Sequence, residues 1–509
     1  MLMRIAKLTG GIVAVSACGL TTAAVTLGDD AGIMRFGRAA MTGASIVVDY
    51  KRTMSSLPTE VNDEYKLKMS QVHTRSADKL LQLCCRNGGC FIKVGQHVGS
   101  LDYLLPKEYV STLKVLHDSA PESSKEAVLQ VIREDLGEEV MSQFESFSDK
   151  PIGTASLAQV HKAVLKDGTV LAVKVQHPKV KAHSFVDMNT MEVLVQTVAW
   201  LFPSFSFLWL AAETRRNLPL ELDFENEGKN AERVGEMLSY ISCLKVPRIY
   251  WGFSSPRVLT MEFCEGGRAD DREYMLAHDI PVEEVSNNLS HMYSEMIFKH
   301  GFVHCDPHPG NVLVKRTSKH NAEIVLLDHG LYTTLTQEFR QNYAKLWMAI
   351  IKGDEVGLRE HSKAMNCEDL YGLFSCMVAG RAWSSITARR LESGEVIADE
   401  DDQIQKDAAD QVVNMVQVLN KVPREMLLIF KTNDCLRGID SSLRTRFRAN
   451  AFISMTKSCT AVVFDEKMRL AETWWLRLWL KLQLTVSLLF IDMTHLCLRV
   501  LAGYKQTSS

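Results

Sequence analysis

The sequence lacks paired cysteines at metal-ligand spacing, internal repeats and any strong excess of charge. Its 12 cysteines are scattered, and the only cluster, Cys84, Cys85 and Cys90, has no matching His/Cys pair downstream. We therefore expect mostly free, buried thiols, which fit a reducing compartment or one with selective oxidation. The formal net charge of −3 supplies no overall basic field, so we expect no nucleic-acid partner.

Long hydrophobic runs are also scarce. The longest charge-free apolar run near the C-terminus lies between Lys481 and Asp492, whereas a membrane span needs about 20 apolar residues. Three tryptophans with Arg477 and Lys481 lie within residues 474–481, a composition that suits either a membrane interface or a groove of the protein itself. We expect this tail to pack on the protein.

The first 27 residues contain Arg4 and Lys7 but no acidic residue, and they are rich in Ala, Gly, Val, Ser and Thr. Three interpretations remain open: a secretory signal peptide, a mitochondrial targeting segment, or a marginal membrane anchor. The residues themselves do not separate the three.

What the sequence has is an ordinary globular composition, 46% hydrophobic and 23% charged, and a length of 509 residues that allows several domains. Apolar spacing predicts a mostly helical region from about residue 31 to 126, and short β-rich runs begin at Pro151. From Asp328 to about Asn450 we expect helices, broken by an exposed acidic loop at residues 394–402. We expect five segments along the chain. They are an N-terminal targeting segment or membrane anchor (residues 1–30), a helical extension (31–145), a small lobe (146–265), a large lobe (266–465) and an amphipathic helical tail (466–509).

One pair of loops combines the residue types that phosphoryl transfer needs. Residues 304–311 place Asp306 five positions before Asn311, in a stretch of Pro and Gly that cannot continue a helix. A short apolar run from Ile324 then leads to Asp328. In phosphoryl transfer one carboxylate orients the attacking oxygen, while an amide and a second carboxylate hold Mg²⁺ on the nucleotide. We therefore expect Asp306 to be catalytic and Asn311 and Asp328 to bind the metal.

A β-hairpin with a small-residue stretch at its start precedes these loops. Residues 153–161 are rich in small side chains, which allow a backbone to approach phosphates closely. The turn at residues 166–168 leads into an apolar strand that carries Lys174. A lysine at this place is either a surface residue or a phosphate contact of a kinase small lobe.

The roles of several further charged residues allow two interpretations. Residues 218–227 are acidic and would ordinarily form a solvated face, and the spacing alone does not choose a partner for Lys174. Periodicity places Lys93 on a solvated helix face. The strand from Val258, which runs into Gly266-Gly267, has the form of a linker between two lobes.

Taken together, these stretches resemble the UbiB family of atypical kinases, also called aarF-domain-containing kinases. Lys93 to Gln96 is similar to the family's KxGQ motif, and Glu221 to Asp223 to its ExD motif. Residues 153–160 resemble its alanine-rich loop, residues 304–311 its catalytic loop, and Asp328 its metal-binding aspartate. The resemblance runs from about residue 79 to 438. Residues 96–106 are most similar to a mitochondrial animal branch.

The resemblance changes the reading of several residues. It implies that Glu227 pairs with Lys174, and that a lid helix covers the nucleotide site with Lys93 and Gln96 meeting Glu221 and Asp223. Such a lid would occupy the groove that a protein substrate needs. The residues expected to contact the nucleotide are Ile152, Gly153, Thr154, Ala155, Ser156, Leu157, Ala158, Gln159, Val160, Lys174, Glu227, Glu262 and Cys264.

Two positions depart from the family pattern. Gly153-Thr154 stands where many members carry Ala-Ala, which bears on the nucleotide preference. His329 replaces the usual Phe after the metal-binding Asp328, and that Phe controls the placement of the aspartate in kinases. Neither change removes a ligand.

The resemblance implies an α+β, two-lobed protein-kinase-like fold with a helical N-terminal extension covering the nucleotide site. It also implies an atypical kinase or ATPase that uses ATP or ADP with Mg²⁺ at the mitochondrial inner membrane, where its partners are lipids or membrane proteins. The expected role is lipid, quinone or membrane homeostasis. A nucleotide-binding pseudokinase scaffold is the alternative. A conventional protein kinase is disfavoured because the glycine-rich loop is missing.

Overall fold

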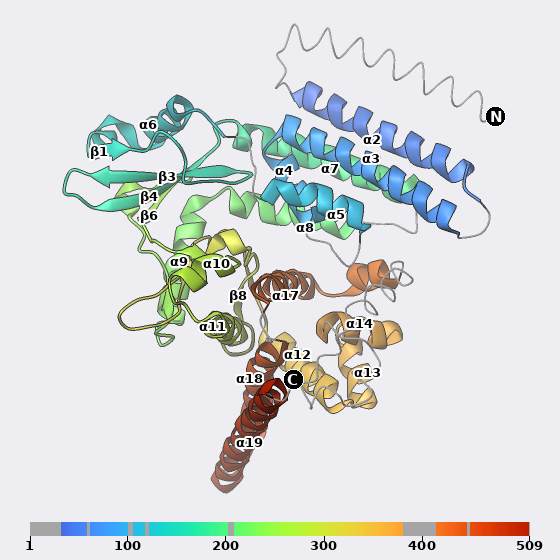
Figure 1. Cartoon of the computed structure of the whole chain (residues 1–509), viewed down its shortest axis with the longest axis vertical. Helices are drawn as coiled ribbons and strands as arrows, with labels where there is room; N and C mark the ends of the chain where they lie inside the picture. Colours follow the sequence, from blue (N-terminus) through green and yellow to red (C-terminus); the bar gives the residue numbers. More distant parts are fainter. Residues whose placement is uncertain are drawn as a thin grey trace. The chain divides into compact units, whose positions relative to one another are not determined.

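The computed structural model describes residues 32–58, 62–99, 105–117, 122–201, 208–379, 414–444 and 448–507. These residues form two compact units. Unit 1 comprises the chain up to Glu225 together with Tyr250–Phe263, and unit 2 comprises Asn226–Ile249 and the chain from Cys264 onward (Figure 1). Each unit mixes helices and strands.

A helical layer makes up the first part of unit 1. Its helices are α2 (Gly32–Ser55), α3 (Asp63–Asn87), α4 (Cys90–Gly99), α5 (Lys107–Leu113), η1 (Lys114–His117), α7 (Val180–Leu201) and α8 (Leu208–Glu221). Their core includes Phe91, Ile92, Leu116 and Leu218, each at most 4% exposed. This layer confirms the helical region expected from the apolar spacing between about residue 31 and residue 126.

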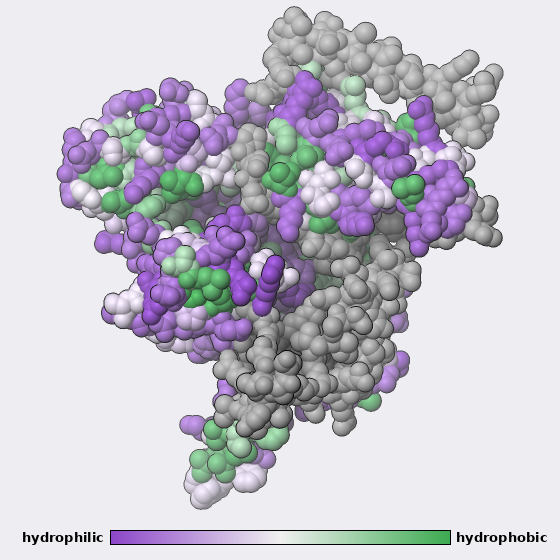
Figure 2. Space-filling model, in the orientation of Figure 1, coloured by the Kyte–Doolittle hydropathy of each residue, from purple (hydrophilic) through white to green (hydrophobic). Residues whose placement is uncertain are grey.

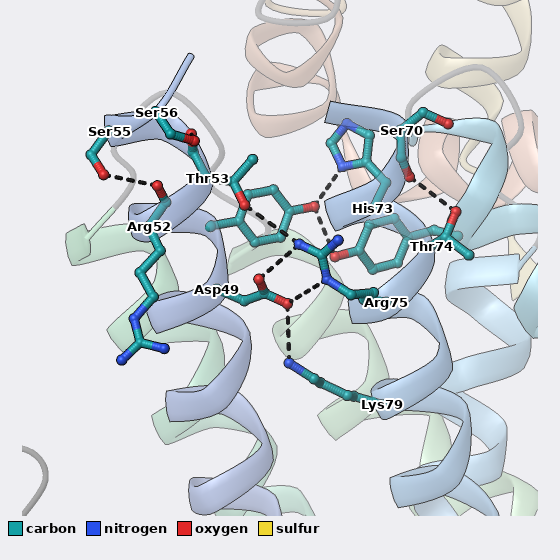
Figure 3. A network of polar contacts seen from close by, with 12 residues as sticks. Asp49, Arg52, Thr53, Ser55, Ser56, Ser70, His73, Thr74, Arg75 and Lys79 are labelled. Atoms are coloured by element: carbon teal, nitrogen blue, oxygen red, sulfur yellow. Dashed lines mark hydrogen bonds and ion pairs between the residues drawn. The ribbon is translucent and has the colours of Figure 1, made fainter. Parts of the chain in front are cut away.

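Polar contacts tie α2 to α3 (Figure 3). The Asp49 carboxylate accepts hydrogen bonds from Arg75 at 2.9 and 3.1 Å and from Lys79 at 3.2 Å. The Tyr50 hydroxyl lies 2.6 Å from His73 Nδ1. Because the ion pairs of Asp49 are partly exposed, we expect them to contribute little beyond the alignment of the two helices.

The second part of unit 1 is an antiparallel sheet in the order β1 (Phe144–Phe147), β3 (Ala158–Leu165), β4 (Val170–Gln176) and β6 (Val258–Glu262), with β2 (Gly153–Thr154) beside β3. The hairpin expected around residues 166–168 is confirmed, and Gly168 adopts the positive φ of 86° that its turn requires. Alternate residues Leu171, Val173 and Val175 are buried in a core shared with α6 (Lys125–Met141).

Unit 2 holds the catalytic loops between short strands. Its first elements are α9 (Phe224–Met237), most of which lies in unit 2, then β5 (Leu244–Lys245), β7 (Gly267–Arg268), α10 (Arg272–Ala277), α11 (Val282–Ser294) and η3 (Glu295–His300). The short η2 (Trp251–Phe253), between β5 and β7 in the chain, belongs to unit 1. The loops follow on β8 (Phe302–His304), η4 (Pro309–Asn311), β9 (Val312–Lys315), β10 (Glu323–Leu326) and β11 (Tyr332–Thr334). One sheet has the order β5-β10-β9-β7, and β11 pairs with β8.

The rest of unit 2 is helical: α12 (Gln337–Lys352), α13 (Glu355–Lys363), η5 (Glu368–Leu370), α14 (Tyr371–Ala379), α17 (Arg424–Leu443), α18 (Arg448–Leu470) and α19 (Trp474–Thr507). Helices predominate here as the sequence predicts. The acidic loop expected at residues 394–402 lies outside the described residues.

The expectation that the C-terminal tryptophans pack on the protein is wrong. Trp474, Trp475 and Trp479 are 61%, 65% and 56% exposed. Figure 2 shows hydrophobic residues on the surface of α19, at the lower end of the view. Composition alone does not reveal which face of an apolar helix is covered, because α19 uses other residues to pack on α18. Among the described helices, none is long and apolar enough to cross a membrane.

Candidate phosphoryl-transfer site

The catalytic loop of unit 2 folds back on itself after β8. The backbone N–H of His308 donates to the carbonyl of Asp306 at 2.8 Å, and the N–H of Asn311 donates to the carbonyl of His308 at 2.8 Å. The Asn311 side-chain amide also donates to the Asp306 carbonyl at 3.1 Å. These bonds hold Asp306 and Asn311 close together and leave the oxygen of the Asn311 amide available as an acceptor or ligand.

The β9–β10 hairpin brings Asp328 to the same loop. Val312 pairs with Leu326 in this hairpin, and the Leu327 N–H donates to the Asn311 carbonyl at 2.9 Å. Asp328 Oδ1 accepts a hydrogen bond from the Gly330 N–H at 2.9 Å, which fixes the turn that follows. The two expected metal ligands, Asn311 and Asp328, are therefore presented by loops that are bonded to each other.

These two residues suit Mg²⁺. Within the described parts of the chain there is no group of three or more His, Cys, Asp or Glu residues that could hold a metal by itself. Magnesium is usually held by one or two protein oxygens together with nucleotide phosphates and water, rather than by a complete protein cage. An amide oxygen and a carboxylate on adjacent loops fit that mode.

His329, the departure from the family pattern, is buried and bonded at both ring nitrogens. Its Nε2 lies 3.1 Å from the Leu326 carbonyl and its Nδ1 lies 2.8 Å from the Tyr332 hydroxyl. Since a carbonyl only accepts, these partners assign the proton to Nε2 and make Nδ1 the acceptor. The imidazole thus replaces the packing of a phenylalanine with two hydrogen bonds that fix the residue after Asp328.

Helix α9 supports the same turn from within unit 2. Glu227 Oε1 accepts a hydrogen bond from the His329 N–H at 3.4 Å, and the Asn230 side-chain amide donates to the His329 carbonyl at 3.0 Å. Glu227 is 1% exposed. Glu227, which is expected to pair with Lys174 and orient it, therefore also contacts the backbone beside Asp328.

A buried aromatic cluster lies behind the catalytic loop. His304 is fully buried, and its Nδ1 lies 2.7 Å from the Tyr293 hydroxyl. Burial lowers the pKa of His304, and burial raises the pKa of Tyr293 and Tyr332 well above the usual range. All three side chains are consequently neutral at physiological pH.

One residue that sequence reasoning missed is Lys431 of α17. Its Nζ lies 3.0 Å from Asp306 Oδ1, and the two side chains are 19% and 20% exposed. The contact is an ion pair whose geometry is not that of a hydrogen bond. The only signal in the sequence was a lysine directly after the apolar residues 426–430, which does not indicate a partner 125 positions upstream.

We expect Lys431→Ala to lower kcat for nucleotide turnover about 10- to 100-fold, because it removes the cation that orients the Asp306 carboxylate. This loss corresponds to roughly 1.4–2.7 kcal/mol of transition-state stabilisation. The KM for nucleotide should change less, and Lys431→Arg should restore part of kcat. Lys421→Ala is the matched control, since Lys421 belongs to the same region and pairs with Asp369 at the exposed surface. An unchanged kcat in Lys431→Ala would show that this ion pair plays no part in turnover.

In unit 1, the KxGQ motif lies on α4. Lys93 Nζ lies 2.8 Å from Glu221 Oε2, and the two side chains are only 13% and 9% exposed. A Cβ on Gly95 would lie 2.4 Å from Leu116 Cδ1, so a larger residue here would displace the buried Leu116 side chain of η1. The Gln96 amide donates to the Leu116 carbonyl at 2.9 Å. Lys93 therefore meets Glu221 as the resemblance implies, while Gln96 anchors the helix to backbone.

Asp223 and the small-residue stretch lie in the same unit. Asp223 Oδ1 accepts from the Glu225 N–H at 3.2 Å where α9 begins. Residues 152–160 form a tight hairpin in which the Ala155 N–H donates to the Ala158 carbonyl at 2.8 Å. Leu157 is buried in the core that contains α4, which links this hairpin to the KxGQ helix.

The residues of this hairpin that were expected to contact the nucleotide fall into a buried group and an exposed group. The side chains of Ser156, Leu157, Ala158 and Gln159 are at most 6% exposed. Gln159 is engaged on both sides of its amide by the Ser123 backbone, at 2.7 and 3.1 Å. At the start of the hairpin Ile152 is 54% exposed, and a Cβ on Gly153 would meet no atom within 4 Å. Nothing in the structure therefore requires glycine at position 153, where many family members carry alanine.

The remaining expected contacts are divided between the units. Lys174 lies on β4 with its Nζ 5.1 Å from the centre of the Phe224 ring, and Glu262 ends β6 opposite Leu171. Both belong to unit 1, whereas Glu227 and Cys264 belong to unit 2. The chain passes from one unit to the other after Phe263, within the stretch expected to link two lobes. The pairing of Lys174 with Glu227 stays a prediction.

An aspartate–asparagine–aspartate set on adjacent loops, with a glutamate-supported turn, defines a kinase-like protein. A sequence profile described as "ABC1 atypical kinase-like domain" matches residues 115–362. The chain is 53% identical to the mouse protein "AarF domain-containing protein kinase 1", with 93% of this chain and 90% of that protein covered. It is 49% identical to the fruit-fly "AarF domain-containing kinase 1", with 86% and 84% covered. The chain therefore belongs to the ABC1 (UbiB) family of atypical kinases, and a kinase-like domain implies nucleotide binding.

Proposed function

We propose that this protein is a Mg²⁺-dependent atypical kinase or ATPase that acts at the mitochondrial inner membrane, in lipid, quinone or membrane homeostasis. The observation that supports it best is the joined pair of loops carrying Asp306, Asn311 and Asp328. All the residue types that phosphoryl transfer needs are present and held in fixed backbone geometry. This argues against a scaffold that has lost its chemistry.

Each residue has a role that follows from its surroundings. Asp306, paired with Lys431, orients the attacking hydroxyl or water and accepts its proton. The oxygens of Asn311 and Asp328 would hold Mg²⁺, which neutralises charge on the nucleotide phosphates. Lys174 would hold the α- and β-phosphates. Glu227 would pair with Lys174 and orient it, while its carboxylate also accepts a hydrogen bond from the His329 backbone.

The substrate class is proposed from the helix that carries Lys93. A desolvated lysine–glutamate pair is costly to break, at roughly 3–5 kcal/mol for the loss of one partner. If α4 lies over the nucleotide as the family resemblance implies, this pair keeps the lid closed and leaves no groove for a folded protein substrate. A lipid or other small acceptor, or water, is then favoured.

The test is phosphoryl transfer by the purified full-length protein, with and without cardiolipin-containing vesicles. We expect Mg²⁺-dependent release of phosphate, or its transfer to a lipid or quinone-like acceptor, and no transfer to generic protein substrates. Nucleotide binding without any turnover under these conditions would support the scaffold alternative. Efficient phosphorylation of unrelated peptides would contradict the closed lid.

The location is proposed from the N-terminal residues, which are basic, apolar and free of acids. We expect residues 1–27, fused to a fluorescent reporter, to carry it to mitochondria and to the inner-membrane fraction. The matched control replaces Arg4 and Lys7 with glutamine, which should leave the reporter outside the organelle. A reporter carried into the secretory pathway by the unaltered segment would overturn this proposal.

A further inference from the structure

Helix α19 presents a continuous apolar stripe to solvent. The stripe is formed by residues spaced three or four apart, which share one helix face. Its members are 54–71% exposed and are Trp475, Trp479, Leu482, Val486, Leu489, Phe490 and Met493. Between its first and last members the stripe extends about 27 Å, at 1.5 Å per residue. A patch of this length and composition marks a surface that contacts something apolar.

The opposite face of the same helix is already occupied. Leu480 is 9% exposed, and the positions that follow it on that face are partly buried where α19 packs on α18. An ion pair between Lys457 of α18 and Asp492 of α19 ties the two helices together. Helices α18 and α19 thus form a helical hairpin. Contact with α18 holds α19 by one face, while the stripe on its other face points to solvent (Figure 2).

The flanks of the stripe disfavour a second helix as its occupant. A coiled-coil seam is narrow and is bordered by charged residues that pair across the interface. Here Leu476, Leu478, Gln483 and Thr485 border the stripe, so that it is broad and carries almost no pairable charge. The charged residues on this border are Asp492, which is paired with Lys457, and Lys481 near the α18–α19 turn.

The end of the stripe at the α18–α19 turn combines aromatic and basic residues. Trp474, Trp475 and Trp479 are exposed there. Four basic residues lie near the turn: Lys467, Arg469, Arg477 and Lys481. Three acids accompany them, Asp465, Glu466 and Glu472, and Glu466 is paired with Lys345 of α12. Tryptophan concentrates at the headgroup level of bilayers, and basic residues there attract anionic lipid.

We propose that α19 lies in the headgroup region of an anionic lipid bilayer, with the apolar stripe facing the acyl chains and the basic turn contacting lipid phosphates. The α18–α19 hairpin thereby attaches unit 2 to the membrane surface. This inference rests on the exposed stripe and not on turnover, and it adds a lipid-binding surface to the proposed function.

The test is flotation of the full-length protein with vesicles of phosphatidylcholine alone or with 30% of an anionic phospholipid. We expect wild type to float with the anionic vesicles, and the double variant Leu482→Glu, Leu489→Glu to bind at least about 30-fold more weakly, since two exposed apolar contacts are lost. The matched control is Phe185→Glu, Trp200→Glu, which changes two apolar residues of α7 that are even more exposed, at 67% and 79%. The control should float like wild type.

Additional variants and controls test the role of the basic residues and separate this inference from the proposed function. Arg477→Gln, Lys481→Gln should lose the preference for anionic over neutral vesicles while keeping residual binding. Nucleotide turnover without vesicles should be the same in wild type and the stripe variant, which separates failure of this inference from failure of the proposed function. Equal flotation of wild type and the stripe variant would overturn it. So would a purified dimer that the stripe variant dissociates, because a second copy would then cover the stripe.

Discussion

Replacing Asp306 with asparagine is expected to lower kcat for nucleotide turnover by about 10²- to 10⁴-fold, the usual contribution of a positioned general base. The amide has nearly the shape of the carboxylate but neither accepts a proton nor attracts Lys431. The loop should keep its geometry, because the Asn311 amide and the His308 N–H donate to the Asp306 backbone carbonyl, which the substitution leaves in place. Steady-state turnover and nucleotide affinity, measured on the same preparation, should therefore diverge.

The matched control is Asp279→Asn, which alters an exposed carboxylate of the same unit. It should leave turnover within about twofold of wild type. If Asp306→Asn also retained wild-type kcat with normal nucleotide affinity, Asp306 would not be the base, and the assignment of the catalytic loop would fail. A loss of affinity equal to the loss of kcat would instead indicate that the carboxylate acts in binding.

The second large effect concerns Lys93. Lys93→Ala should leave the Glu221 carboxylate unpaired in a nearly buried position, at a cost on the order of 3–5 kcal/mol. The penalty should fall on α4, whose other anchors include the Gln96 bond to Leu116 and its apolar contacts. We expect amide exchange at residues 91–98 to accelerate by about 10²-fold or more, with altered nucleotide affinity or turnover, while the sheet of unit 1 keeps its protection.

Two variants serve as controls for Lys93. Lys79→Ala removes a lysine whose partner Asp49 is partly exposed, and it should change stability by less than about 1 kcal/mol. Lys93→Ala combined with Glu221→Ala should recover part of the loss, since the uncompensated charge is gone. If Lys93→Ala leaves exchange, affinity and turnover all at wild-type values, α4 is no lid.

The catalytic loops could be predicted from the sequence because their geometry is local. Asp306 and Asn311 belong to one loop, and Asp328 follows a strand that pairs directly with the strand after Asn311. The β3–β4 hairpin is local in the same sense. In each case the spacing of residues fixes which groups meet.

Contacts between distant segments could not be predicted that way. Periodicity placed Lys93 on a solvated face, and only the family resemblance indicated its partner Glu221, 128 positions later. Lys431 belongs to none of the motifs considered, so that its contact with Asp306 was missed. For α19 the composition suggested burial, but whether an apolar helix is covered depends on its neighbours, and α18 covers only one face.

Binding of Mg²⁺–nucleotide to the folded chain tests the central claim most directly. Thermal unfolding of the purified full-length protein should be measured with ATP or ADP, each with Mg²⁺ and with EDTA, for wild type and Asp328→Asn. A ligand that binds only the folded state at 100 times its Kd adds about 2.7 kcal/mol of stability. We predict a Mg²⁺-dependent rise in Tm for wild type that Asp328→Asn largely loses. A full rise in Asp328→Asn, or none in wild type with either nucleotide, would contradict the assignment of the site.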